Sequence, residues 1–182
     1  MPLYPIQILS IHIAPDHKIF GKTDEDLSGA DLISLSKAQF IADSGIEGDR
    51  FCRHRPKYNG HVTFFSAEVW EAITESFELN QSIGPEILRR NILVSGVDLK
   101  ALYGQAFSIQ GIQFLGTVHC APCTAMNRAL GDGARAALRD RGGLRAQVKS
   151  VGRLRLGKSD LATNASMIPN HAATRPDQPS LP

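Results

Sequence analysis

The chain has 182 residues, of which 42% are hydrophobic and 21% charged, with a formal net charge of +2. This length fits one domain, and the balanced composition excludes collagen-like, coiled-coil and wholly disordered proteins. The small net charge gives no global basic field of the kind that attracts nucleic acid, and no apolar run approaches the roughly 20 residues of a membrane helix.

The N-terminal segment does not have the pattern of a secretory signal. It lacks a basic leader and a small-residue cleavage pattern, and Pro2 and Pro5 interrupt it. We therefore expect a cytoplasmic protein. In that reducing compartment, the odd number of cysteines indicates free thiols at Cys52, Cys120 and Cys123.

Alternating apolar residues predict strands in the first half of the chain, over 6–13, 31–42 and 61–65. Between the last two, Gly45 and Gly48 indicate a tight irregular connection. Ser66 is typical of a helix N-cap and predicts a helix over 67–77.

The second half is predicted to contain more short strands than helices. Strand patterns occupy 91–94, 106–109, 112–118 and two stretches within 144–157, and helix patterns occupy 124–130 and 134–141. Gln110-Gly111 predicts a hairpin turn. The many strands favour a mainly β domain, a barrel or strongly bent sheet over residues 1–157, and the polar composition of 158–182 predicts a disordered tail.

The segment HCAPCT at 119–124 carries the strongest chemical signal. It follows a predicted strand and enters a predicted helix, so Cys123 falls near a helix N-terminus, where unpaired amides favour a nucleophilic thiolate. Cys120 is predicted to continue the inward-facing side of the strand. A buried structural role stays open for either cysteine.

Three other interpretations of this segment also stay open. A structural zinc site would need two more ligands, and the sequence offers only scattered histidines. A reversible dithiol would normally lie in a thioredoxin-like context, which this β-rich chain lacks. His119 could be a proton shuttle or a structural histidine.

Basic residues gather in three predicted loops. Arg89, Arg90 and Asn91 precede one strand, Arg50 begins a basic run after GIEGD, and Arg145 follows a Gly-Gly pair. Arginine suits phosphate or carboxylate, and asparagine suits the edge of a heterocycle. The loops form an anion site if they converge, and a solvated basic rim if they do not.

Four blocks of sequence resemble the MOSC domain, named for the C-terminal domain of molybdenum cofactor sulfurases. In order, they are GIEGDRF, HVTFFSAE, RRNILVSGVDLKALYGQAFSI, and HCAPC followed by LGDGARAALRDRGGLRAQV. The likeness runs from about Ile6 to Gly157. It implies a MOSC-type β-barrel-like fold with a few short helices.

The resemblance also implies a reactive cysteine at Cys123, carrying sulfur as a persulfide or ligating the molybdenum of a molybdopterin-type cofactor. By the same resemblance, Arg50, Arg89, Arg90 and Asn91 would contact that cofactor. His61 would join them, at a place where many members carry a glutamine or a His-Gly pair.

The resemblance predicts a sulfur carrier or transferase that takes sulfur from a separate cysteine desulfurase. Its acceptor would be a molybdopterin-type cofactor, a molybdenum-cofactor enzyme or another metal-sulfur centre. Pyridoxal phosphate is not expected in this chain, because stand-alone members lack the desulfurase domain of fused sulfurases. Nucleic acid and membrane partners are not expected either. The alternatives are a molybdenum-dependent reductase of N-hydroxylated compounds and a non-catalytic module that binds a phosphorylated ligand.

Overall fold

A closed β-barrel is the main feature of the computed structural model, which describes residues 1–15, 32–55, 57–80 and 82–167. Within these residues, seven strands close the barrel. Their order around it is β1 (Leu3–Ile13), β11 (Gly157–Thr163), β7 (Ala106–Ile109), β8 (Ile112–His119), β9 (Leu144–Val148), β5 (Val62–Ser66) and β6 (Ile92–Ser95). The predicted mainly β, barrel-like fold is confirmed.

One long strand closes the barrel. β1 pairs with β11 through Leu3–Ile8 and with β6 through Gln7–Ile11, each time antiparallel. The β5–β6 pair is parallel, and the remaining barrel pairs are antiparallel. Closure leaves the barrel strands without free edges.

A smaller sheet of β10 (Gly152–Arg155), β3 (Lys37–Ile41) and β4 (Gly45–Ile46) lies beside the barrel. The single strand predicted over 31–42 is wrong, because the chain bends at Ser36. Before the bend, β2 (Ile33–Ser34) pairs with the end of β1; after it, β3 pairs with β10. Two different partners therefore divide the segment.

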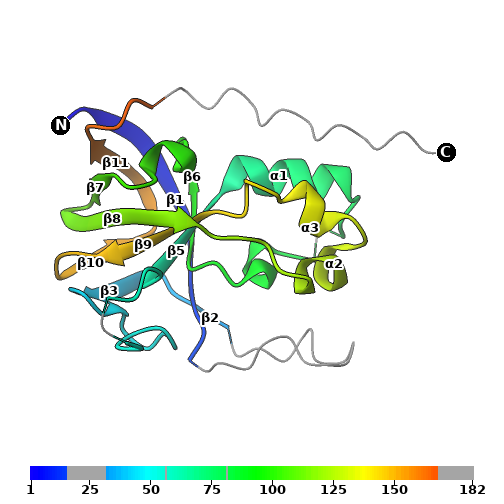
Figure 1. Ribbon diagram of the computed structural model, residues 1–182, viewed down its shortest axis with the longest axis horizontal. Helices are drawn as coiled ribbons and strands as arrows, with labels where there is room; N and C mark the ends of the chain where they lie inside the picture. The colour runs from blue at the N-terminus through cyan, green and yellow to red at the C-terminus, as the bar shows by residue number, and fades with distance from the viewer. Residues whose placement is uncertain (16–31, 56, 81, 168–182) are drawn as a thin grey trace.

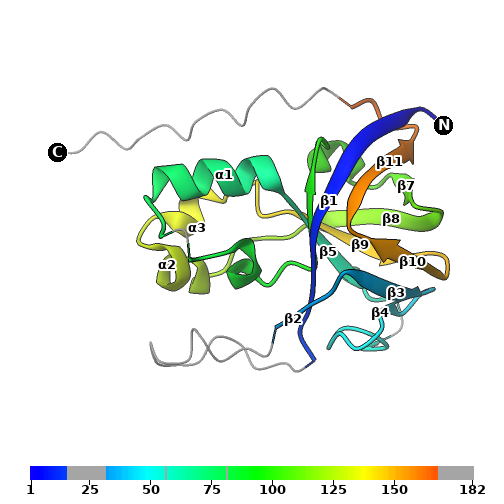
Figure 2. The ribbon, with the colours of Figure 1, turned by 180° about the vertical axis from the view of Figure 1, so that it is seen from behind.

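The helices gather on one side of the barrel (Figures 1 and 2). They are α1 (Ala67–Ser76), α2 (Ala125–Leu130) and α3 (Ala134–Ala137), with the short 3₁₀ turn η2 (Pro85–Leu88). A second 3₁₀ turn, η3 (Leu99–Leu102), contacts the barrel strands β5, β8 and β9 instead. The Ser66 cap is confirmed, since its hydroxyl accepts the Val69 N–H at 3.3 Å. None of the helices among the described residues is long and apolar enough to span a membrane.

The buried core consists of two apolar clusters, one inside the barrel and one between the barrel and the helices. Phe64, Phe107 and Phe114 meet inside the barrel, with ring centroids 5.2–5.6 Å apart. A second cluster joins Phe65 of β5 to α1, α2 and α3. Because β5 and β6 contribute residues to both sides, the strand ends meet the helices at a fixed junction.

Two predicted boundaries need correction. α3 ends at Ala137 rather than at 141, because the chain turns through Asp140, which has a positive φ of 60°. The tail predicted from Lys158 is wrong over 158–167, since β11 is a barrel strand paired on both sides. Residues 168–182 lie outside the described part of the chain.

Candidate functional site

A register shift separates the end of β8 from the rest of the strand. Gly116 pairs with Ala146, but Val118, two residues later, pairs with Arg145, one residue earlier. Paired residues share a face of the sheet, so the extra residue moves the later side chains of β8 to the opposite face. Cys120 follows the strand end, and the same alternation puts it on the face of Arg145 rather than on the predicted inward face; its predicted burial is confirmed.

The neighbours of the shift hold it in place. The Thr117 hydroxyl donates to the carbonyl of Asn59 at 2.6 Å and can also donate to that of Arg145 at 2.9 Å. A Cβ at Gly116 would collide with the carbonyl oxygen of Leu102. Close packing against η3 therefore requires glycine here.

Cys120 is buried in a polar setting. Its residue is 2% exposed, yet it belongs to neither apolar cluster. Its N–H donates to the Gly143 carbonyl at 2.8 Å. Burial acts to lower the pKa of Arg145, but charge interactions and hydrogen bonds with Cys120 and Tyr58 outweigh it and raise that pKa. A guanidinium thus lies against the Cys120 thiol.

Arg90 fixes the backbone around this thiol. Its guanidinium donates to the carbonyls of Gly142 at 2.9 Å, Leu88 at 3.0 Å and Cys120 at 3.3 Å. All three acceptors are neutral, so these bonds leave the positive charge of Arg90 available to attract an anion.

The pKa of His119 depends on the charged side chains of this region. Its Nε2 accepts the Gly142 N–H at 3.0 Å, which places the proton of the neutral ring on Nδ1. Burial lowers the pKa of His119, Asp140 raises it, and three cations lower it further: Arg90, Lys100 and Arg145. The neutral ring has a structural bond, and more cations than anions influence its pKa.

Tyr103 lies on the same side of the junction. Its ring centroid is 6.5 Å from that of His119. Burial, followed by Asp140, Asp98 and Cys120, raises the pKa of Tyr103 to about 12, so the phenol stays protonated at neutral pH. No local pattern marks Tyr103, Tyr58 or Lys100 in the sequence, because long-range packing brings them to the strand end.

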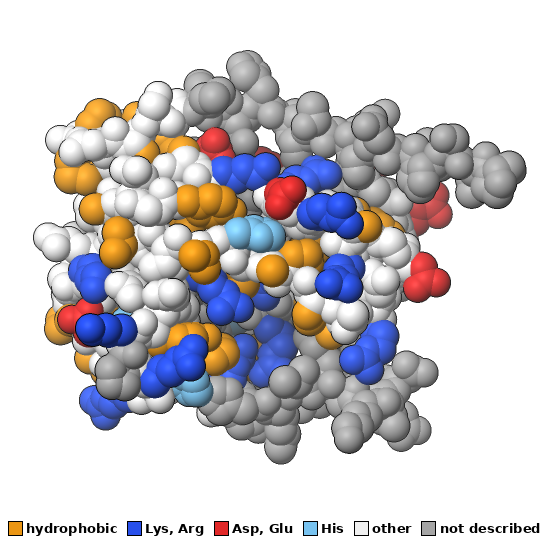
Figure 3. Space-filling view, in the orientation of Figure 1, with side chains coloured by type: hydrophobic (Ala, Val, Ile, Leu, Met, Phe, Trp, Pro, Cys, Tyr) orange, Lys and Arg blue, Asp and Glu red, His pale blue; other side chains and the backbone are white. Residues whose placement is uncertain are grey.

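Cys123 is exposed, three residues beyond the buried Cys120. It lies in the connection between β8 and α2, and its carbonyl accepts the N–H of Met126 at 3.0 Å. Its predicted place just before a helix is confirmed. Figure 3 shows Lys and Arg side chains around a hollow where the strand side meets the helix side.

Asn91 does not face this region with free polar groups. It is 7% exposed, its Oδ1 accepts from Thr63 twice, at 2.9 and 3.0 Å, and its Nδ2 donates to His12 and Asp49 at 3.1 Å. These bonds join three segments of chain. The amide predicted to contact a cofactor is thus already engaged within the protein.

The other two predicted arginines occupy different surroundings. Arg50 lies in the turn after β4, with its guanidinium 4.6 Å from the centroid of the Phe51 ring. Arg89 ends η2 in a left-handed conformation, with a φ of 54°, and is half-buried. The cations that influence His119 are instead Arg90, Lys100 and Arg145.

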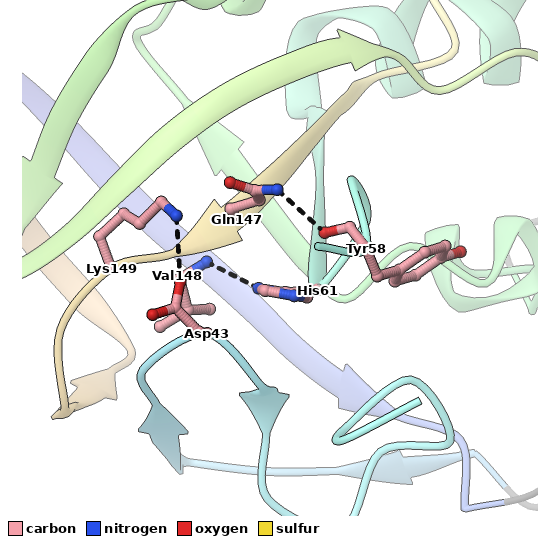
Figure 4. Close-up of polar contacts among 6 residues, drawn as sticks. All are labelled: Asp43, Tyr58, His61, Gln147, Val148 and Lys149. Atoms are coloured by element: carbon pink, nitrogen blue, oxygen red, sulfur yellow. Dashed lines mark hydrogen bonds and ion pairs between the residues drawn. The ribbon is translucent and has the colours of Figure 1, made fainter. Parts of the chain in front are cut away.

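His61 is part of the barrel wall (Figure 4). It is 2% exposed, and its Nδ1 accepts the Val148 N–H at 3.2 Å. Burial lowers its pKa, with opposing effects from Asp43 and Lys149, which form an ion pair of 3.0 Å. The ring is therefore buried rather than open to a cofactor, and the predicted contact of His61 with one stays a prediction.

The described residues contain no group of three or more His, Cys, Asp or Glu side chains that could hold a metal. The zinc interpretation therefore finds no ligand set in this part of the chain. What the junction offers is an exposed thiol, a second thiol beside a guanidinium, and a surplus of positive charge.

Comparison with known proteins agrees with this architecture. The family model of the MOSC domain matches residues 47–159. YuaD of Bacillus subtilis is similar in structure, with a TM-score of 0.66 and 18% identity, covering 88% of this chain and 96% of that one. YiiM of Escherichia coli gives a TM-score of 0.61 and 14% identity, with coverages of 93% and 74%. No curated protein matches the sequence.

Proposed function

This chain belongs to the MOSC domain family, and we propose that it carries sulfur as a persulfide on Cys123 for a molybdopterin-type cofactor. MOSC domains are associated with molybdenum-cofactor sulfurase or binding functions. The observation that carries the proposal is the exposure of the Cys123 thiol, four residues beyond the end of β8 at His119, whose pKa Arg90, Lys100 and Arg145 act to lower.

Loading is a displacement at sulfur. The Cys123 thiolate attacks the outer sulfur of a persulfide on the donor, a cysteine desulfurase. The donor's S–S bond breaks, its cysteine leaves as a thiolate, and the outer sulfur becomes bonded to Cys123. Exposure matters here because the donor is a separate protein, and only an exposed thiol can reach its persulfide.

The cations serve the second half of the transfer. A persulfide is anionic, and a molybdopterin-type acceptor carries a phosphate. The uncompensated charge of Arg90, together with Lys100 and Arg145, attracts both anions to the junction. The persulfide S–S bond of Cys123 then breaks, and the outer sulfur passes to the acceptor, which is the substrate, free or in a cofactor enzyme.

The test measures sulfur on the protein. After incubation with a cysteine desulfurase and cysteine, the intact mass should gain one sulfur atom, which a thiol reductant removes. Cys123→Ser should abolish this gain, and Cys52→Ser, at a partly buried cysteine, should keep it. An undiminished gain in Cys123→Ser would refute the proposal.

A resident molybdenum cofactor is the second candidate, because the exposed Cys123 is a soft ligand and no larger ligand group lies among the described residues. Such a site suits a metal whose pterin already supplies two sulfurs. Cys123 would then hold the metal, which supplies two-electron reduction of an N-hydroxylated substrate. Molybdenum in equimolar amount in protein from a cofactor-producing host would favour this candidate, and its absence would favour the carrier.

A further inference from the structure

We infer that Cys120 is a resolving thiol, which attacks the Cys123 persulfide and releases its outer sulfur as hydrosulfide. The inference rests on the proposed function and adds to it the chemical form in which sulfur leaves. It starts from the register shift in β8, which turns Cys120 away from the barrel core and toward Arg145.

The two cysteines differ in what can reach them. Cys120 is 2% exposed, so a donor protein cannot approach its sulfur, whereas Cys123 is exposed. Residues 121–124 belong to neither a helix nor a strand. Only two residues separate the cysteines, the Cys-x-x-Cys spacing found in redox-active dithiols.

The surroundings of Cys120 suit an attacking sulfur. Interactions with the Cys120 thiol and the Tyr58 phenol raise the pKa of Arg145, so a positive charge lies near the sulfur that becomes negative. Arg90 and the Gly143 carbonyl hold the Cys120 backbone. The thiol therefore has a fixed position and does not depend on a mobile loop.

The step balances. The Cys120 sulfur attacks Sγ of Cys123, the persulfide S–S bond breaks, and hydrosulfide leaves with the bonding electron pair. The Cys120 sulfur is oxidised from the thiol to the disulfide level, the outer sulfur is reduced to sulfide, and the Cys123 sulfur keeps its oxidation state. The Cys120 proton passes to solvent or to the leaving group. A dithiol reductant of the thioredoxin type then restores both thiols.

The experiment loads the full chain with a cysteine desulfurase, removes the donor and follows the protein without oxygen. In the wild type, sulfide release should match formation of a Cys120–Cys123 disulfide, seen by peptide mapping. Cys120→Ser should release sulfide about tenfold more slowly, or less, per persulfide loaded. Cys52→Ser should behave as wild type.

Arg145→Lys is a second variant that keeps both thiols, and it should also slow release per persulfide loaded. Thermal melting shows whether each variant is folded. If the wild type loads Cys123 but holds its persulfide as long as Cys120→Ser does, the resolving role is wrong and the carrier function stands. If the wild type does not load at all, both are wrong.

Discussion

Arg90 and Asn91 are neighbours in the sequence, but their side chains have different tasks. The side-chain amide of Asn91 is hydrogen-bonded to Thr63, His12 and Asp49. Arg90 bonds only to carbonyls, so it shapes the site and keeps its charge. The type of residue predicted polar contacts at both positions, and burial decided which of them a ligand could use.

Asn91→Ala should lower the free energy of unfolding by about 3 kcal/mol, because it leaves buried donors and acceptors without partners. Urea unfolding measures the change. Asn164→Ala, at an exposed position, is the control and should stay within about 0.5 kcal/mol of wild type. Equal stability of the two variants would show that Asn91 does not clamp the three segments.

At the scale of elements, β11 shows how a polar sequence becomes a barrel strand. Its segment GKSDLAT has one large apolar residue, Leu161, and its composition is typical of a tail. In the structure, Leu161 and Thr163 are buried, Lys158 and Asp160 are exposed, and backbone bonds to β1 and β7 supply the rest. Strand pairing with distant partners leaves little trace in composition.

Leu161→Ala should cost about 2–4 kcal/mol of unfolding free energy, because it removes a side chain from the barrel core. Leu156→Ala makes the same change at a residue that is 43% exposed, and should cost less than about 0.5 kcal/mol. The difference between their denaturant midpoints is the measurement. Equal denaturant midpoints for the two variants would mean that this segment is the tail that its composition predicts.

In the whole molecule, the barrel and the helices meet at the end of β8. There Cys120 is buried and Cys123 is exposed. Burial, as the largest effect, also lowers the pKa of three histidines: His12, His61 and His119. Their neutral rings belong to the folded state, so the stability of the whole chain depends on pH.

Below about pH 6.5 these histidines bind protons in the unfolded chain but stay neutral in the folded chain. The free energy of unfolding should therefore fall as pH decreases from 7.5 to 5.5. One such histidine contributes up to about 1.4 kcal/mol per pH unit. His61→Asn keeps an acceptor near the Val148 N–H and should flatten the dependence. His54→Asn, at an exposed position, controls for loss of an imidazole, and equal slopes in both variants would contradict this account.

Local patterns were enough to predict the Ser66 cap, the hairpin at Gln110-Gly111, most strands and the position of Cys123 before a helix. Each depends on residues close together in the chain. The face of Cys120, the burial of His61 and the closure by β11 depend on partners far away in sequence. One extra residue in β8 reverses its side chains, and only pairing with β9 reveals it.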